Sequence, residues 1–143
     1  MLTENAVVKA VKVYLEAAGY RVDKARSTVQ RGIDLEAVHS ATNKRLLVEA
    51  KGGTSSKRKT ARFGRGFTRN QAKSHVSVAF YYVAKLRQQH RGAQVAVAFP
   101  DDPNHRALID SIRSALNELG IVVFFVNAAR RVRILDDQSL SRG

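Results

Sequence analysis

Apolar residues recur along the chain at two spacings, and each spacing predicts a different kind of element. Over residues 4–18 they fall three or four positions apart, which predicts an amphipathic helix that stops at Gly19. The next apolar groups are short and bounded by polar, turn-rich residues, which favours strands, the last two joined as a hairpin. The three expected strands are residues 20–25, 33–39 and 45–51.

The second half of the chain alternates helices with strongly apolar strands. Residues 68–71 have the form of a capping box, which predicts a long helix that continues to about residue 89. Residues 93–99 and 121–126 are almost continuous runs of β-branched and aromatic residues, as in strands that are buried on both faces. Residues 104–119 predict a helix between them, and the three together form a β-α-β unit.

These elements give the order α-β-β-β-α-β-α-β, which indicates an α/β fold with a mixed sheet covered by helices. Residues 131–135 are expected to add an edge strand, and residues 136–143 to form a frayed tail. We expect residues 1–135 to form a single domain, because 143 residues are the length of one domain and suffice for a sizeable core.

The charge of the chain points to a polyanionic partner. There are 25 Lys and Arg against 12 Asp and Glu, and no acid occurs between Glu49 and Asp101. Clustered cations gain affinity for a phosphate backbone by displacing its counterions, so nucleic acid is the expected partner. Residues 52–67 are rich in Gly, Ser, Thr and basic residues, which predicts a flexible basic loop. The residues expected to contact nucleic acid are Lys57, Arg58, Lys59, Arg62, Arg65, Arg69, Lys73 and His75.

The absence of cysteine excludes several kinds of chemistry. Without it there are no disulfides, no thiolate catalysis and no Cys-based zinc sites, and a reducing, cytoplasmic setting is favoured. The chain also has no apolar run long enough for a signal peptide or a membrane span, so we expect a soluble protein without a membrane partner.

Two acids and a lysine stand out in the expected hairpin, RGIDLEAVHSATNKRLLVEAKGG. Glu49 and Lys51 share one face of their strand, because side chains alternate between the faces. If paired residue numbers add up to 83, Asp34 lies opposite Glu49; if they add up to 85, Glu36 does, and Asp34 is diagonal to it. Either register puts carboxylates from both strands on one face. Their repulsion calls for a cation, which is either Lys51 alone or Lys51 with a metal such as Mg²⁺.

These residues match a family pattern. Asp34 stands in Gly-Ile-Asp-Leu at the start of one strand, and Glu49-Ala50-Lys51 follows the apolar Leu-Leu-Val of the next. The chain resembles the PD-(D/E)xK nuclease superfamily, which has the restriction-endonuclease-like fold, and in particular its small Holliday-junction-resolvase-like members. The core order of that family is similar to the order above over most of the chain. Ile33 replaces the proline that names the motif, at a position that is loose in the family.

The resemblance implies a Mg²⁺-dependent nuclease in which Mn²⁺ is able to substitute. Asp34 and Glu49 would hold the metal, and the backbone carbonyl of Ala50 could supply another ligand. Lys51 would position or activate a water and stabilise charge on the phosphate. Resolvase-type members often place a glutamate of the first helix in the site, and Glu4 fits that position. The alternative is a structural role for Glu4, in which the helix dipole stabilises an acid in the first turn.

The resemblance also suggests that polar residues of the second long helix belong to the site. Gln71 is expected to take part in catalysis, and His75 to face the site or contact phosphate. Each residue has a structural alternative. Gln71 completes the capping box with Thr68, and a histidine at the border of an apolar stripe is usually structural.

The sequence therefore predicts a Mg²⁺-dependent DNA endonuclease, structure-selective or part of a repair, restriction or mobile-element system. The alternative is a catalytically silent nucleic-acid-binding module of the same fold, in which the carboxylates are structural. A third interpretation is a small-molecule or protein-interaction domain whose charge serves solubility. A homodimer would let two sites cut both strands, and the sequence leaves the oligomeric state open.

Overall fold

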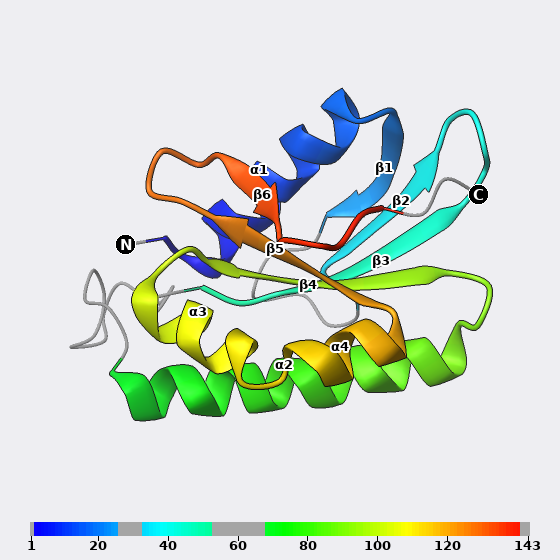
Figure 1. Ribbon diagram of the computed structural model, residues 1–143. Coiled ribbons are helices and arrows are strands. Elements are labelled where there is room, and N and C mark those ends of the chain that lie inside the picture. Colours follow the sequence, from blue (N-terminus) through cyan, green and yellow to red (C-terminus); the bar gives the residue numbers. More distant parts are fainter. Residues whose placement is uncertain (1, 26–32, 53–67, 141–143) are drawn as a thin grey trace.

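The computed structural model describes residues 2–25, 33–52 and 68–140 (Figure 1). The remaining residues, which include most of the expected basic loop, lie outside the described part of the chain. The elements, in chain order, are α1 (Glu4–Ala17), β1 (Tyr20–Ala25), β2 (Leu35–His39), β3 (Arg45–Ala50), α2 (Arg69–Gln89), β4 (Gln94–Pro100), α3 (Pro103–Asp110), α4 (Arg113–Leu119), β5 (Ile121–Val126) and β6 (Val132–Ile134).

The strands form one six-stranded mixed sheet in which they are ordered as in the chain, from β1 to β6. Strands β1, β2 and β3 pair antiparallel, β3 pairs parallel with β4, and β4 pairs parallel with β5. Strand β6 joins β5 antiparallel at the edge. The α/β class, the antiparallel start, the β-α-β unit and the added edge strand are therefore confirmed.

Helices cover both faces of the sheet. Helix α1 packs on one face, and α2, α3 and α4 pack on the other (Figure 1). Residues of strand β3 alternate between the two cores. Leu46 and Val48 are buried in the core between the sheet and α1, whereas Leu47 is buried in the core between the sheet and α2. Because Glu49 is two positions after Leu47, its side chain leaves the strand on the α2 face.

The helix starts follow from capping residues. The Thr3 hydroxyl accepts a 3.2 Å hydrogen bond from the backbone N–H of Ala6 and so caps α1. At the start of α2, the Thr68 hydroxyl accepts from the Gln71 N–H at 3.2 Å, and the Gln71 side-chain oxygen accepts from the Thr68 N–H at 2.9 Å. The predicted capping box and the extent of this helix are confirmed.

The single helix expected over residues 104–119 is wrong, because the chain forms α3 and α4 with a break at Ser111 and Ile112. The Ser111 hydroxyl donates a 2.6 Å hydrogen bond to the carbonyl of Leu108, and Ile112 has non-helical backbone angles. A serine that binds the preceding turn competes with the helical hydrogen bonds, whereas the apolar spacing continues across the break.

The segment expected to fray is attached to the sheet as far as residue 140. The Gln138 side-chain oxygen accepts from the Val123 N–H at 2.8 Å, and its amide nitrogen donates to the Ile121 carbonyl at 2.9 Å. Leu140 packs against the core beneath α1. Gln138 therefore binds the first half of β5, ahead of the β5 residues that pair with β6, and this attachment differs from the expected frayed tail.

Among the described residues, no helix combines the length and the apolar character needed to cross a membrane.

Candidate functional site

The β2–β3 hairpin has the register in which paired residue numbers add up to 83. Leu35 pairs with Val48, and one further step along the register places Asp34 opposite Glu49. The alternative register is wrong: Glu36 pairs with Leu47 instead, and its carboxylate lies 3.6 Å from a guanidinium nitrogen of Arg45. Of the two acids that competed for the position opposite Glu49, Asp34 occupies it.

The turn between the strands sets this register. Asn43 has a φ of 60°, a left-handed conformation that asparagine tolerates better than most residues. The His39 N–H donates to the Lys44 carbonyl at 2.9 Å, which closes a four-residue loop. The Nδ1 of His39 also accepts from the N–H groups of Ala41 and Thr42, at 3.2 Å each. These bonds fix the loop length and, with it, the residue that faces Glu49.

Asp34 is buried and tied to the neighbouring strand. The residue is 8% exposed, and one of its carboxylate oxygens accepts a 2.9 Å hydrogen bond from the backbone N–H of Ala50. The N–H and C=O of one strand residue point to the same edge of the strand. The Ala50 carbonyl is therefore directed to the edge at which Asp34 lies.

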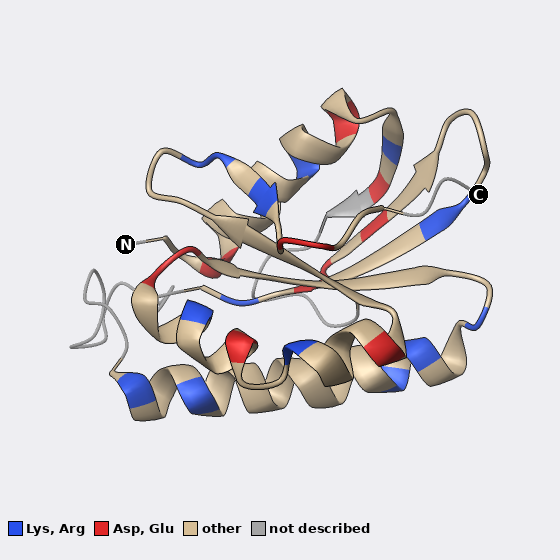
Figure 2. Ribbon diagram, viewed as in Figure 1, with Lys and Arg blue, Asp and Glu red and all other residues tan. Residues whose placement is uncertain are grey.

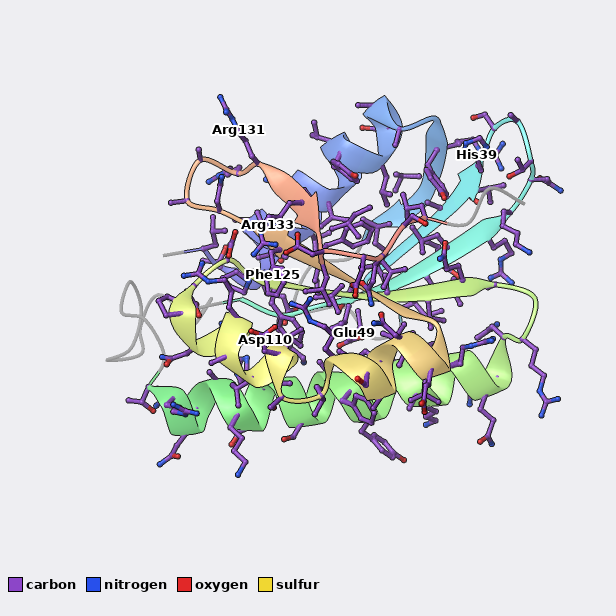
Figure 3. All side chains as sticks on the ribbon, in the orientation of Figure 1. His39, Glu49, Asp110, Phe125, Arg131 and Arg133 are labelled. Atoms are coloured by element: carbon purple, nitrogen blue, oxygen red, sulfur yellow. The ribbon has the colours of Figure 1, made fainter. Side chains whose placement is uncertain are left out.

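Glu49 and Lys51 form an ion pair at the end of β3. The Lys51 Nζ lies 3.6 Å from a Glu49 carboxylate oxygen, and the two side chains are 18% and 12% exposed. The Lys51 N–H donates to the Ala98 carbonyl at 2.9 Å, which holds this residue against β4 just beyond the end of the strand. Figure 3 shows Glu49 between the sheet and the helices beneath it.

The two carboxylates at this site do not ionise easily. Burial and, after it, the charge of Asp34 raise the pKa of Glu49 to about 7, against the opposing charge of Lys51. Burial likewise raises the pKa of Asp34, against the hydrogen bond from Ala50 and the charge of Lys51. Near neutral pH, two negative charges at this place are costly, and a second cation would relieve that cost.

Helix α1 begins at the same place. A Cβ atom added to Gly52 would lie 2.5 Å from the backbone nitrogen of Glu4, so the chain after Lys51 touches the start of the helix. Burial and, after it, the charge of Asp34 raise the pKa of Glu4 to about 7, against the opposing charge of Lys51. Glu4 is thus within electrostatic reach of the acid pair, as its place on the first helix suggested.

The donor atoms fit a hard divalent cation. Asp34, Glu49 and the Ala50 carbonyl supply oxygen, and Mg²⁺ is usually held by one or two carboxylates with waters and phosphate oxygens completing its shell. Within residues 2–25, 33–52 and 68–140, no three His, Cys, Asp or Glu side chains form a group placed to hold a metal ion. The fit therefore rests on two carboxylates, and direct ligation by Glu4 stays a prediction.

Helix α2 brings one of its two expected site residues toward Lys51. Burial lowers the pKa of His75, and the charges of Lys51 and His105 lower it further, so the imidazole is close enough to feel both. A lowered pKa favours the neutral ring, which suits hydrogen bonding better than ionic contact with phosphate. Gln71 is engaged in the capping box with Thr68, and its catalytic role stays a prediction.

The basic surface is described only in part. Helix α2 carries Lys and Arg and no acid, as Figure 2 shows along its length, and Arg69 and Lys73 are exposed on it. The other expected nucleic-acid contacts lie outside the described residues: Lys57, Arg58, Lys59, Arg62 and Arg65.

The sequence reasoning missed a pocket beside Glu49. It has a volume of about 540 Å³ and lies between the start of β2, the end of β3 and the second half of α2. The signal for it was present in the helical spacing, because residues 82, 86 and 89 share one face of α2. Its lining residues are Ile33, Glu49, Tyr82, Lys85, Leu86, Gln89 and His90.

A second polar pair was also missed, at the start of α3. The Asp102 carboxylate caps the helix by accepting from the His105 N–H at 2.8 Å, and the same carboxylate lies 2.9 Å from the His105 Nδ1. His105 is 1% exposed and stacks on Phe99, with ring centroids 5.3 Å apart. The carboxylate thus supports a buried histidine that is close enough to His75 to affect its pKa.

Comparison with known proteins finds a likeness in fold. No protein-family model and no curated protein matches the chain. An XisH family protein from Nostoc punctiforme is similar with a TM-score of 0.54 and 13% identity, over 92% of this chain and 99% of that chain. An fdxN element excision controlling factor protein from Anabaena variabilis has the same TM-score and coverage at 12% identity. At these identities, the chain shares the fold of both proteins.

Proposed function

We propose that the chain is a Mg²⁺-dependent DNA endonuclease with a restriction-endonuclease-like core. The observation that carries the proposal is the convergence of Asp34, Glu49 and Lys51 at the end of β3. Two poorly solvated carboxylates face each other there, and the Lys51 ammonium lies 3.6 Å from one of them. This combination of hard oxygen ligands with a fixed cation is suited to hydrolysis of a phosphodiester.

Each residue would have a defined part in the reaction. Asp34 and Glu49 would hold the metal, and the Ala50 carbonyl would complete the protein's share of the ligands. When bound, Mg²⁺ would neutralise phosphate charge and lower the pKa of a bound water. Lys51 would exchange its contact with Glu49 for one with a phosphate oxygen, where its charge stabilises the developing negative charge. The Ala50–Asp34 hydrogen bond would keep the Asp34 carboxylate oriented throughout.

The surroundings of the site favour DNA as the substrate. The sequence between Glu49 and Asp101 has no acid, and Arg69 and Lys73 extend this basic character along α2. Such a surface attracts a phosphate backbone at low ionic strength. One fold neighbour is named an fdxN element excision controlling factor, and we extend the proposal to excision of a mobile element as one setting for the cleavage.

The experiment is cleavage of supercoiled plasmid and of a four-way junction with Mg²⁺ by the wild type, Glu49→Ala and Glu36→Ala. Glu36 is the matched control, because it lies on the same hairpin but pairs with Leu47 and Arg45. We expect the wild type and Glu36→Ala to cut, and Glu49→Ala to lose on the order of 100-fold in rate. Intact substrates with the wild type, or equal cutting by Glu49→Ala, would overturn the proposal.

The second candidate is a catalytically silent nucleic-acid-binding module. The ion pair between Lys51 and Glu49 favours it, since Lys51 already balances one of the two acids without a metal. This candidate predicts salt-dependent DNA binding that is insensitive to Mg²⁺, together with intact substrates in the cleavage experiment.

A further inference from the structure

The pocket beside Glu49 has two walls of different character. One wall is formed by Ile33 and Glu49, at the start of β2 and the end of β3. The other is the face of α2 that carries Tyr82, Lys85 and Leu86, followed by Gln89 and His90 at the helix end. The pocket is therefore continuous with the proposed reaction centre, because Glu49 belongs to both.

The lining of the pocket combines the groups that bind a nucleotide. Tyr82 offers an aromatic ring on which a base can stack, and the aliphatic side chains of Ile33 and Leu86 provide further apolar contact. Lys85 is an exposed lining residue whose positive charge suits a phosphate flanking the base. Gln89 and His90 supply hydrogen-bonding groups for the edge of a base.

The volume of the pocket also suits one nucleotide and not a duplex. About 540 Å³ lies within the range of pockets that enclose small ligands. A base inside a duplex is stacked on both sides and cannot present its face to Tyr82, whereas an unpaired base can. The occupant must therefore come from a strand that is open beside the position at which cleavage takes place.

We propose that this pocket receives one unpaired nucleotide next to the scissile phosphate, stacked on Tyr82 and held through its phosphate by Lys85. This inference rests on the proposed function and names its substrate class: DNA with an unpaired strand at the cut site, such as a flap or a splayed arm. Fully paired duplex would bind through the basic surface alone and would leave the pocket empty.

Helix α2 supplies a matched control for the stacking residue. Tyr81 and Tyr82 are neighbours, with ring centroids 5.7 Å apart, and both are exposed. Tyr81 is 63% exposed and does not line the pocket, whereas Tyr82 is 47% exposed and does. Replacement of either tyrosine removes the same surface aromatic group from the same helix, so a difference between the two variants reports on the pocket.

The test is equilibrium binding of flap DNA and of the corresponding paired duplex in EDTA, at one fixed salt concentration. We expect the wild type, Tyr81→Ala and Tyr82→Phe to prefer the flap by about tenfold, within the range that one base–aromatic stack supports. Tyr82→Ala is expected to lose that preference and keep its duplex affinity. A fluorescent base analogue at the flap nucleotide should change its emission on binding to the wild type and Tyr81→Ala, but not to Tyr82→Ala.

Equal binding of both DNAs by the wild type, or equal behaviour of Tyr81→Ala and Tyr82→Ala, would overturn the inference. A Tyr82→Phe variant that behaves as Tyr82→Ala would also overturn it, because phenylalanine keeps the stacking face. The binding is measured without metal, so it does not depend on turnover. If Glu49→Ala abolishes cleavage while Tyr82→Ala keeps the flap preference, this inference fails and the nuclease proposal stands. If no protein cuts DNA, the nuclease proposal fails separately.

Discussion

The backbone N–H of Ala50 donates a 2.9 Å hydrogen bond to the buried carboxylate of Asp34. Ala50 directly follows Glu49, so this bond holds the Asp34 carboxylate beside the strand end that carries the other acid. A side chain fixed in this way is pre-organised, which a metal-binding or catalytic group requires. Glu36 differs from Asp34 in its position on the hairpin, because it pairs with Leu47 and its carboxylate lies 3.6 Å from the Arg45 guanidinium.

The close approach of Gly52 to helix α1 predicts a sensitive position. A Cβ atom at residue 52 would lie 2.5 Å from the Glu4 nitrogen and 2.8 Å from the Thr3 carbonyl carbon, and both are backbone atoms that cannot turn away. We expect Gly52→Ala to lower the free energy of unfolding by about 1–3 kcal/mol, as overpacking does. Urea denaturation followed by circular dichroism measures this change.

Gly92→Ala is the control for that substitution, because nothing lies within 4 Å of an added Cβ atom there. We expect its free energy of unfolding to stay within about 0.5 kcal/mol of the wild type. Equal effects of the two substitutions would show that the contact between the end of β3 and α1 is looser than described.

The raised pKa of Glu49 predicts a pH-dependent stability difference between the wild type and Glu49→Gln in EDTA. Because the folded pKa is about 7 against an ordinary value of 4.5, the folded state binds this proton more tightly than the unfolded state. The stabilising contribution is complete below pH 4.5 and is lost as the pH rises through 7. The Glu49→Gln variant carries a neutral side chain at every pH, so its stability does not fall in this way as the pH rises.

We therefore expect Glu49→Gln to be more stable than the wild type at pH 8, by about 2 kcal/mol, with a smaller difference at pH 4.5. Thermal denaturation of both proteins across this range measures the difference, and a subtraction at each pH removes the contributions of other groups. A difference that does not change with pH would contradict the described burial of the acid pair.

The Asp102 carboxylate predicts a stability effect away from the proposed site. It caps α3 and supports the buried His105 through Nδ1, so Asp102→Ala removes both bonds. We expect a loss of about 1–3 kcal/mol in the free energy of unfolding, measured by urea denaturation. The matched control is Asp110→Ala: Asp110 pairs with Arg113 at 2.6 Å but is 64% exposed, so we expect a change below about 1 kcal/mol.

Sequence patterns were sufficient for most of the fold because apolar spacing reports which side of an element is buried. The same spacing did not reveal the helix break at Ser111, because Ile109, Ile112 and Leu116 keep helical spacing across it. At the break, the Ser111 hydroxyl donates to the Leu108 carbonyl and Ile112 leaves the helical backbone conformation. Local side-chain bonds of this kind are not visible in a periodicity.

The candidate site could likewise be predicted from the sequence only in part. Alternation along β3 was sufficient to place Glu49 and Lys51 on one face, but the partner across the hairpin depended on the turn. The left-handed conformation of Asn43 and the hydrogen bonds to the His39 ring fix the register that places Asp34 opposite Glu49. Neither feature follows from the alternation of apolar and polar residues in the strands. The pocket at Tyr82 was missed because it joins residues of the β2–β3 hairpin to residues of α2, which are distant in sequence.

The most direct test of the account is calorimetric titration of Mn²⁺ into the wild type, Asp34→Asn, Glu49→Gln and Glu36→Gln. Mn²⁺ takes the same oxygen ligands as Mg²⁺, and calorimetry reports binding without any need for turnover. We expect one ion per chain in the wild type and in Glu36→Gln, and loss of that binding in Asp34→Asn and Glu49→Gln. Absence of binding to the wild type, or equal binding by all four proteins, would contradict a metal centre at Asp34 and Glu49.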